Sequence, residues 1–178
     1  MTTNILLAGF GGQGILFAGK SLAKMAMDSE LQVSWLPSYG PEMRGGAANC
    51  SVIISDEEIG SPLVVTPDLL IAMNLPSFDK FEPAVKAGGT VIFDSTLIPK
   101  VSERSDIGAY AIPATGMASD AGLTGMANVI ILGYMLKLTG LFEYDAFLEH
   151  MLAGIPASKA ALIDKNKKAL EMGYNYAE

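Results

Sequence analysis

The sequence has almost none of the side chains that build redox or metal centres. It contains one cysteine, Cys50, and one histidine, His150, among 178 residues. One thiol cannot form an internal disulfide, and an iron–sulfur cluster takes about four cysteine ligands. A conventional zinc site also needs more cysteine and histidine than this. Cys50 lies in an apolar stretch and is expected to be a small buried residue, while His150 is expected on the surface of an amphipathic helix. The chain alone is therefore predicted to bind no metal and no redox cofactor.

Charge and long apolar runs are also scarce. Charged residues make up 17% of the chain and the net charge is −7, so no basic stripe is available for nucleic acid. No apolar run reaches the roughly 18 residues of a membrane helix, and the N-terminus lacks the charged region of a signal peptide. We therefore expect a cytoplasmic protein that binds neither nucleic acid nor membrane. Half of the residues are hydrophobic, and residues 1–178 are predicted to form a single domain.

A glycine-dense turn is the most informative feature that is present. The apolar run Asn4–Ala8 stops at Gly9-Phe10-Gly11-Gly12-Gln13-Gly14, and a helix-like segment follows at once. Gly9, Gly11 and Gly14 match the G-x-G-x-x-G spacing of dinucleotide-binding turns. Free N–H groups at the start of the helix would favour an anion. The spacing fits a nucleotide or phosphate site, and it also fits a plain turn between the first strand and the first helix.

The second half of the dinucleotide fingerprint is missing. Nicotinamide-binding domains hold the ribose with an acidic residue at the end of the next strand. Here that strand, Leu31–Leu36, ends at Pro37, and Asp28 and Glu30 precede it. Ordinary NAD binding is therefore not expected.

Hydrophobic periodicity predicts alternating strands and helices. Because no helix separates the strands at 31–36 and 47–55, these two strands are expected to be antiparallel in an otherwise mostly parallel sheet. The fold class is predicted as α/β, with three α/β/α layers and a Rossmann-like mixed sheet. The prolines and glycines of 37–46 exclude regular structure there. Further strands are predicted at 68–73, 90–93 and 109–112, with a short one near 63–65, and helices at 12–28, 77–81, 83–87, 126–139, 143–152 and 158–172.

A second unusual stretch is Tyr39-Gly40-Pro41-Glu42-Met43-Arg44-Gly45-Gly46. Arg44 is flanked by glycines, and the planar fork of arginine suits a carboxylate or a phosphate. The alternative is a turn in which Arg44 pairs locally with Glu42. In a doubly wound sheet this loop and the glycine turn open on the same carboxyl edge of the strands, where ligands bind.

The motifs at 9–14 and 38–46, together with Pro-Asp-Leu-Leu-Ile-Ala-Met-Asn at 67–74, resemble the gamma subunit of 2-oxoacid:ferredoxin oxidoreductases. The resemblance covers the whole chain. The separate gamma chain and the Pro-Glu-Met-Arg-Gly-Gly form look most similar to 2-oxoglutarate:ferredoxin oxidoreductase (2-oxoglutarate synthase). The branched-chain 2-oxoacid enzymes are the next most similar, and the pyruvate and indolepyruvate enzymes come after them.

The resemblance implies a reaction that this chain cannot perform alone. In the family, thiamine diphosphate decarboxylates the 2-oxoacid, iron–sulfur clusters pass electrons to ferredoxin, and coenzyme A takes the acyl group. The implied partners are the alpha, beta and delta subunits, which would carry thiamine diphosphate and the clusters, with ferredoxin reached through the complex. No catalytic residue is expected here. An exposed docking face can also let the isolated chain self-associate.

We expect the glycine turn and the loop at 39–46 to form part of the coenzyme A site at the subunit interface. The competing interpretation is that both loops are docking surface, and the two can hold together. A second class of function is a stand-alone nucleotide- or flavin-binding module. The expected binding residues are Gly9, Gly11, Gly12, Gln13, Gly14, Tyr39, Glu42, Arg44, Gly45 and Gly46.

Overall fold

The computed structural model describes residues 1–39 and 47–177. Six strands form one sheet in the order β2-β3-β1-β4-β5-β6. Three neighbouring pairs, β1–β4, β4–β5 and β5–β6, are parallel, whereas β3 runs antiparallel to both β1 and β2. The predicted mixed sheet and its antiparallel strand are thereby confirmed. The strands are β1 (Thr2–Phe10), β2 (Gln32–Tyr39), β3 (Ala47–Ser55), β4 (Leu69–Ala72), β5 (Thr90–Asp94) and β6 (Gly108–Ile112).

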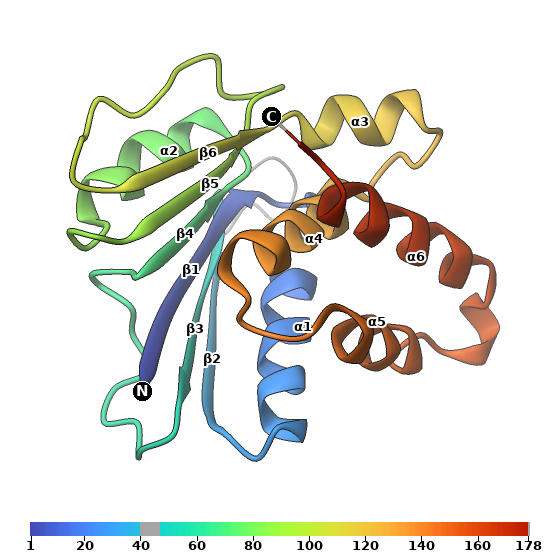
Figure 1. Ribbon diagram of the computed structural model, residues 1–178, viewed down its shortest axis with the longest axis horizontal. Coiled ribbons are helices and arrows are strands. Elements are labelled where there is room, and N and C mark those ends of the chain that lie inside the picture. Colours follow the sequence, from blue (N-terminus) through green and yellow to red (C-terminus); the bar gives the residue numbers. More distant parts are fainter. Residues whose placement is uncertain (40–46, 178) are drawn as a thin grey trace.

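Helices cover both faces of the sheet, as the predicted three layers require (Figure 1). One face carries α1 (Ile15–Asp28), α4 (Ala127–Thr139), α5 (Tyr144–Ala153) and α6 (Ala161–Tyr174). The other face carries α2 (Leu75–Phe81), and α3 (Ala114–Asp120) lies at the end of the sheet where the parallel strands finish. Two short 3₁₀ turns, η1 (Glu82–Ala84) and η2 (Ala157–Lys159), complete the fold. Among the described residues, no helix is both long and apolar enough to cross a membrane.

The sheet is buried on both sides because its strands point apolar side chains to both faces. In β1, Ile5 and Leu7 join the core under α1 and α4, while Leu6 joins the smaller core under α2. Successive side chains of a strand alternate between faces, and a run that is apolar throughout is typical of a strand covered on both faces. Helix α4 is likewise covered on all sides, because nine consecutive residues, 128–136, are buried. The helix predicted at 126–139 is thereby confirmed.

Several local predictions were wrong, each for an identifiable reason. No strand forms at 63–65. Instead Val64 packs into the smaller core and its N–H donates to Ser51 Oγ at 3.2 Å. The predicted helix at 83–87 is only the turn η1, since Val85 is already extended. Strand β2 continues through Pro37 to Tyr39, because an edge strand tolerates the missing N–H of proline.

Some helices also begin at residues other than those predicted. Helix α1 begins at Ile15, three residues later than predicted, because Gly14 has a left-handed φ of 74°. The two-turn helix α3 forms at Ala114–Asp120, between the last predicted strand and the helix predicted at 126–139. The last helix begins at Ala161, and the turn η2 precedes it in place of its predicted start.

Helix α1 approaches β3 closely at Gly19. A Cβ atom on Gly19 would lie 2.3 Å from Cys50 Sγ and 3.3 Å from Val52 Cγ2. Cys50 is fully buried in this contact, and burial raises the pKa of its thiol to about 12. The prediction that Cys50 is a small buried residue is confirmed.

We predict that Gly19→Ala lowers the free energy of unfolding by about 2 kcal/mol, because the new methyl group overpacks the core. Cys50→Ala in the same chain should recover most of that loss by removing the sulfur that the methyl group meets. Urea denaturation of the two single variants and the double variant measures this coupling. Strictly additive losses would contradict the contact.

Candidate functional site

The glycine turn joins β1 to α1 at the carboxyl edge of the parallel strands. Strand β1 ends at Phe10, and the neighbouring parallel strands β4 and β5 end at the same edge. Gly14 caps α1 with no side-chain hydrogen bond to the helix. The first N–H groups of a helix have no partner within it, and together with the helix dipole they favour an anion. The structure therefore places Gly9, Gly11, Gly12, Gln13 and Gly14 together at the predicted position.

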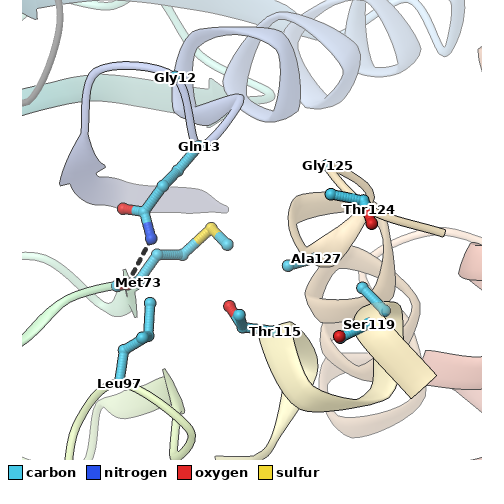
Figure 2. A pocket seen from close by; sticks show the side chains of 10 residues that line it. Gly12, Gln13, Met73, Leu97, Thr115, Ser119, Thr124, Gly125 and Ala127 are labelled. Atoms are coloured by element: carbon cyan, nitrogen blue, oxygen red, sulfur yellow. Dashed lines mark hydrogen bonds between the residues drawn. The ribbon is translucent and has the colours of Figure 1, made fainter. Parts of the chain in front are cut away.

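The side chain of Gln13 ties this turn to the next strand. Its Oε1 accepts a hydrogen bond from the Phe10 N–H at 2.6 Å, and its Nε2 donates to the Met73 carbonyl oxygen at 2.8 Å (Figure 2). Gly9 makes room for this arrangement, since a Cβ atom there would lie 2.5 Å from Gln13 Oε1. Gln13 thus fixes the turn against β4, and each of its two amide atoms keeps capacity for one further hydrogen bond.

A cleft of about 330 Å³ opens beside Gln13. Figure 2 shows Gln13, Met73 and Leu97 on one side of it, with Thr115, Ser119 and Thr124 on the other. The cleft is small but within the range of ligand pockets. It lies outside the carboxyl ends of parallel strands, the position at which open α/β sheets bind ligands. Its lining residues are Gly12, Gln13, Met73, Leu97, Thr115, Ala118, Ser119, Thr124, Gly125 and Ala127.

A buried carboxylate holds Thr115, one of the residues that line this carboxyl-edge cleft. Asp94, at the end of β5, has no exposed surface. It accepts hydrogen bonds from the N–H of Thr96 and from both the N–H and the hydroxyl of Thr115. The Thr115 hydroxyl is thereby committed as a donor. Ser119 and Thr124 bond to no other group of the described residues through their hydroxyls, so these two side chains can donate to a ligand.

Two helices begin at this cleft rather than one. Ala127, the first residue of α4, lines it beside Gly125. Asn128 connects the two helix starts, because its Nδ2 donates to the Gly14 carbonyl oxygen at 3.2 Å. Gly14 permits this approach, since a Cβ atom there would lie 2.3 Å from Asn128 Nδ2. The cleft therefore lies between two helix N-termini, which together favour a negatively charged group.

The second predicted segment begins at the same edge of the sheet. Tyr39, the last residue of β2, pairs with Ala48 of β3, which pairs in turn with Gly9 of β1. The backbone of Tyr39 is thus two strands away from the glycine turn. Glu42, Arg44, Gly45 and Gly46 lie outside the described residues. Their participation in the site, and that of the Tyr39 side chain, stays a prediction.

His150 is less exposed than its amphipathic helix indicated. Its side chain is 19% exposed, and its Nδ1 lies 2.6 Å from Asp28 Oδ2. Asp28 is the last residue of α1, so this pair joins α5 to α1. The partner was not foreseen because 122 residues of sequence separate the two. Sequence analysis also did not identify Met73, Thr115, Ser119 and Thr124, which line the cleft, or Asn128, which connects the starts of its two helices.

These features define an α/β domain with an anion-favouring cleft at the carboxyl edge of a mixed sheet. Residues 4–176 match the pyruvate ferredoxin/flavodoxin oxidoreductase family. The chain therefore belongs to the pyruvate ferredoxin/flavodoxin oxidoreductase family, and the resemblance found in its motifs is confirmed.

Individual relatives agree with this assignment. The chain is 42% identical to the ketoisovalerate oxidoreductase subunit VorA of Methanothermobacter marburgensis over 97% of this chain, but it spans only 36% of that relative. It is 36% identical to the 2-oxoglutarate synthase subunit KorC of Methanocaldococcus jannaschii, over 100% of this chain and 95% of the relative. The solved gamma subunit of a keto/oxoacid ferredoxin oxidoreductase from Geobacter sulfurreducens superposes with a TM-score of 0.84 at 31% identity, covering 98% of this chain and 95% of the other.

Proposed function

We propose that this chain is the gamma subunit of a multi-subunit 2-oxoglutarate:ferredoxin oxidoreductase. Such an enzyme decarboxylates the 2-oxoacid oxidatively, transfers the acyl group to coenzyme A and passes the electrons to ferredoxin. The supporting observations are the 36% identity to the 2-oxoglutarate synthase subunit KorC of Methanocaldococcus jannaschii and the Pro-Glu-Met-Arg-Gly-Gly form of residues 41–46. VorA is more similar residue by residue, at 42% identity, so a branched-chain 2-oxoacid is the competing substrate.

The redox and decarboxylation chemistry would belong to partner subunits. The single thiol of this chain, Cys50, is buried in the core and packed against α1, whereas an iron–sulfur cluster takes about four thiolates. We therefore assign thiamine diphosphate and the clusters to the alpha, beta and delta subunits, and ferredoxin contact to the assembled complex. On this proposal the isolated chain is inactive and binds neither thiamine diphosphate nor a cluster.

The contribution of this chain would be part of the coenzyme A site. The carboxyl-edge cleft combines two helix N-termini with two free hydroxyl groups, Ser119 and Thr124. Backbone N–H groups and hydroxyl groups are suitable donors to the phosphate and amide oxygens of coenzyme A. Gln13 holds the turn that forms one wall, and strand β2, which ends at Tyr39, finishes at the same edge of the sheet.

Anaerobic co-purification of the tagged full chain from its native host tests the subunit assignment. We expect stoichiometric partner chains that bring thiamine diphosphate and iron–sulfur clusters, visible by mass spectrometry and by absorbance. Recovery of the chain alone with a tightly bound flavin or nucleotide would refute the assignment and support a stand-alone binding module.

A further inference from the structure

Strand β2 forms one edge of the sheet, and its outer side pairs with no other strand of the described residues (Figure 1). None of residues 32–38 is buried, whereas seven of the nine residues of the neighbouring strand β3 are. Edge strands of soluble proteins are usually protected by charged side chains, bulges or short length. Strand β2 has eight residues without a charge, and its pairing with β3 is regular throughout. Its outer side is therefore open to another strand.

Pro37 shows which backbone groups of β2 face outward. It pairs with Cys50 in regular register, and a proline within a sheet has the side without an N–H directed away from the neighbouring strand. Hydrogen-bonded and non-hydrogen-bonded positions alternate along an antiparallel pair, so Val33 and Trp35 also direct their N–H and C=O groups outward. The free edge thus offers Val33 and Trp35 as residues that can both donate and accept.

We propose that β2 pairs antiparallel with β2 of a second copy of this chain. The two sheets would join about a two-fold axis that passes between the two Ser34 residues. Val33 of each copy then pairs with Trp35 of the other, and an aromatic residue opposite a β-branched one is a favourable cross-strand pair. Both residues that can donate and accept are used in this register, and the contact is self-complementary, as a two-fold dimer requires.

The position of Pro37 favours this register over its neighbours. Pro37 lies opposite Leu31 of the second copy, and the Leu31 N–H already donates to the Ala26 carbonyl oxygen at 3.1 Å. The ladder between the copies therefore ends there without breaking an existing hydrogen bond. A slip that set Pro37 opposite Val33 would leave the Val33 carbonyl oxygen without its donor, which costs free energy in a buried contact.

Helix α1 supplies a second contact on the same face of the joined sheet. It packs over β2, since a Cβ atom on Gly19 would lie 3.2 Å from Trp35 Nε1. Asp28 faces α5 through its pair with His150. Met27 is turned about 100° from Asp28 around the helix, and its apolar side chain is 64% exposed. The two-fold axis would set the two α1 helices antiparallel and side by side, so that both Met27 side chains are covered.

Charge complementarity also favours a second copy as the occupant. Antiparallel helices side by side bring the first half of one helix next to the end of the other. Lys20 lies in the first half of α1, and Glu30 follows shortly after its last residue. Within residues 1–39 and 47–177, neither side chain forms an ion pair. The symmetry brings Lys20 of each copy toward Glu30 of the other, so the dimer should weaken with salt.

Sedimentation equilibrium of the purified full chain over a concentration series tests this proposal. We expect a reversible dimer. Ser34→Lys and Ser34→Glu should each weaken it at least tenfold, because like charges directly opposite each other are unfavourable. An equimolar mixture of the two variants should restore a dimer that contains one chain of each. Ala109→Lys adds the same charge to an exposed position of the other edge strand, β6, and should leave the dimer unchanged.

Disulfide cross-linking provides a second readout that involves no added charge. The Ser34 residues would form a non-hydrogen-bonded pair, whose Cα atoms lie about 4.5 Å apart, within the range of a disulfide. Oxidation of Ser34→Cys should give covalent dimers of this chain, both for the isolated chain and for the purified complex. The matched variant Ala109→Cys should give none.

Three results would overturn the proposal. The first is a parent chain that stays monomeric at every concentration, and the second is a mixture of Ser34→Lys and Ser34→Glu that does not dimerise although both variants are folded by circular dichroism. The third is a Ser34→Cys chain that cross-links only to a different subunit, which would assign the edge to a partner strand. None of these measurements requires activity, so their failure leaves the proposed function intact.

Discussion

Gly173→Ala is expected to lower the free energy of unfolding by about 3 kcal/mol or more. Gly173 of α6 faces α4, and a Cβ atom there would lie 1.8 Å from the Ile130 carbonyl oxygen. The reciprocal contact is nearly as close, because a Cβ atom on Gly133 would lie 2.1 Å from the Leu170 carbonyl oxygen. Both obstacles are backbone atoms in the middle of helices, so no side-chain rotation can relieve the overlap. The two helices must separate, and core packing is lost along their whole contact.

Gly173→Ala is an informative test because helix propensity alone predicts a change in stability of the opposite sign. Alanine is better than glycine in a helix by about 1 kcal/mol, so without the close crossing Gly173→Ala would stabilise the protein. Urea denaturation followed by circular dichroism measures the change. Gly60→Ala is the matched control, because a Cβ atom there meets nothing within 4 Å. A Gly173→Ala variant as stable as the parent would show that α4 and α6 do not cross as closely as described.

Gln13→Glu is expected to raise the KM for coenzyme A of the assembled enzyme about tenfold. The substitution keeps an oxygen that can accept from the Phe10 N–H, but it removes the Nε2 donor to the Met73 carbonyl oxygen. It also places a negative charge in a cleft between two helix N-termini, where the ligand's own anionic group is proposed to bind. Loss of about 1.4 kcal/mol of binding corresponds to this factor.

Steady-state kinetics with varied coenzyme A measures the change, and varied 2-oxoacid serves as the internal comparison. Gln32→Glu makes the same chemical change at an exposed position of the edge strand β2 and is expected to have no effect. Equal KM values for coenzyme A in the parent and Gln13→Glu enzymes would remove Gln13 and the carboxyl-edge cleft from the proposed site. An equal rise in the KM for the 2-oxoacid would indicate a general disturbance of subunit assembly instead.

The antiparallel pairing of β2 and β3 followed from local sequence because chain length limits the possible connections. Only 40–46 separate β2 from β3, which is too short for a parallel crossover, and the antiparallel pairing was predicted on that ground. The errors arose where local preference was outweighed by tertiary position. Pro37 was taken to end β2, yet an edge strand has one side on which a missing N–H costs nothing. Val64 lies in an apolar triplet typical of a strand, but it fills the smaller core from a loop.

The candidate site was only half predictable for a related reason. The spacing of Gly9, Gly11 and Gly14 marks a turn at a strand–helix junction, and the structure places the turn there. The opposite wall comes from residues about a hundred positions later. Ser119, Thr124 and Asn128 are common polar residues without a motif, and only the folding of α3 and α4 onto the carboxyl edge brings them to the turn.

The most direct test of the proposed function is the activity of the anaerobically purified complex that contains this chain. We predict reduction of a viologen dye that requires both 2-oxoglutarate and coenzyme A, and that is much slower with 2-ketoisovalerate or pyruvate. Preference for another 2-oxoacid would contradict the substrate and leave the subunit assignment standing. A complex without any 2-oxoacid- and coenzyme A-dependent reduction, although it contains thiamine diphosphate and iron–sulfur clusters, would contradict the proposed function itself.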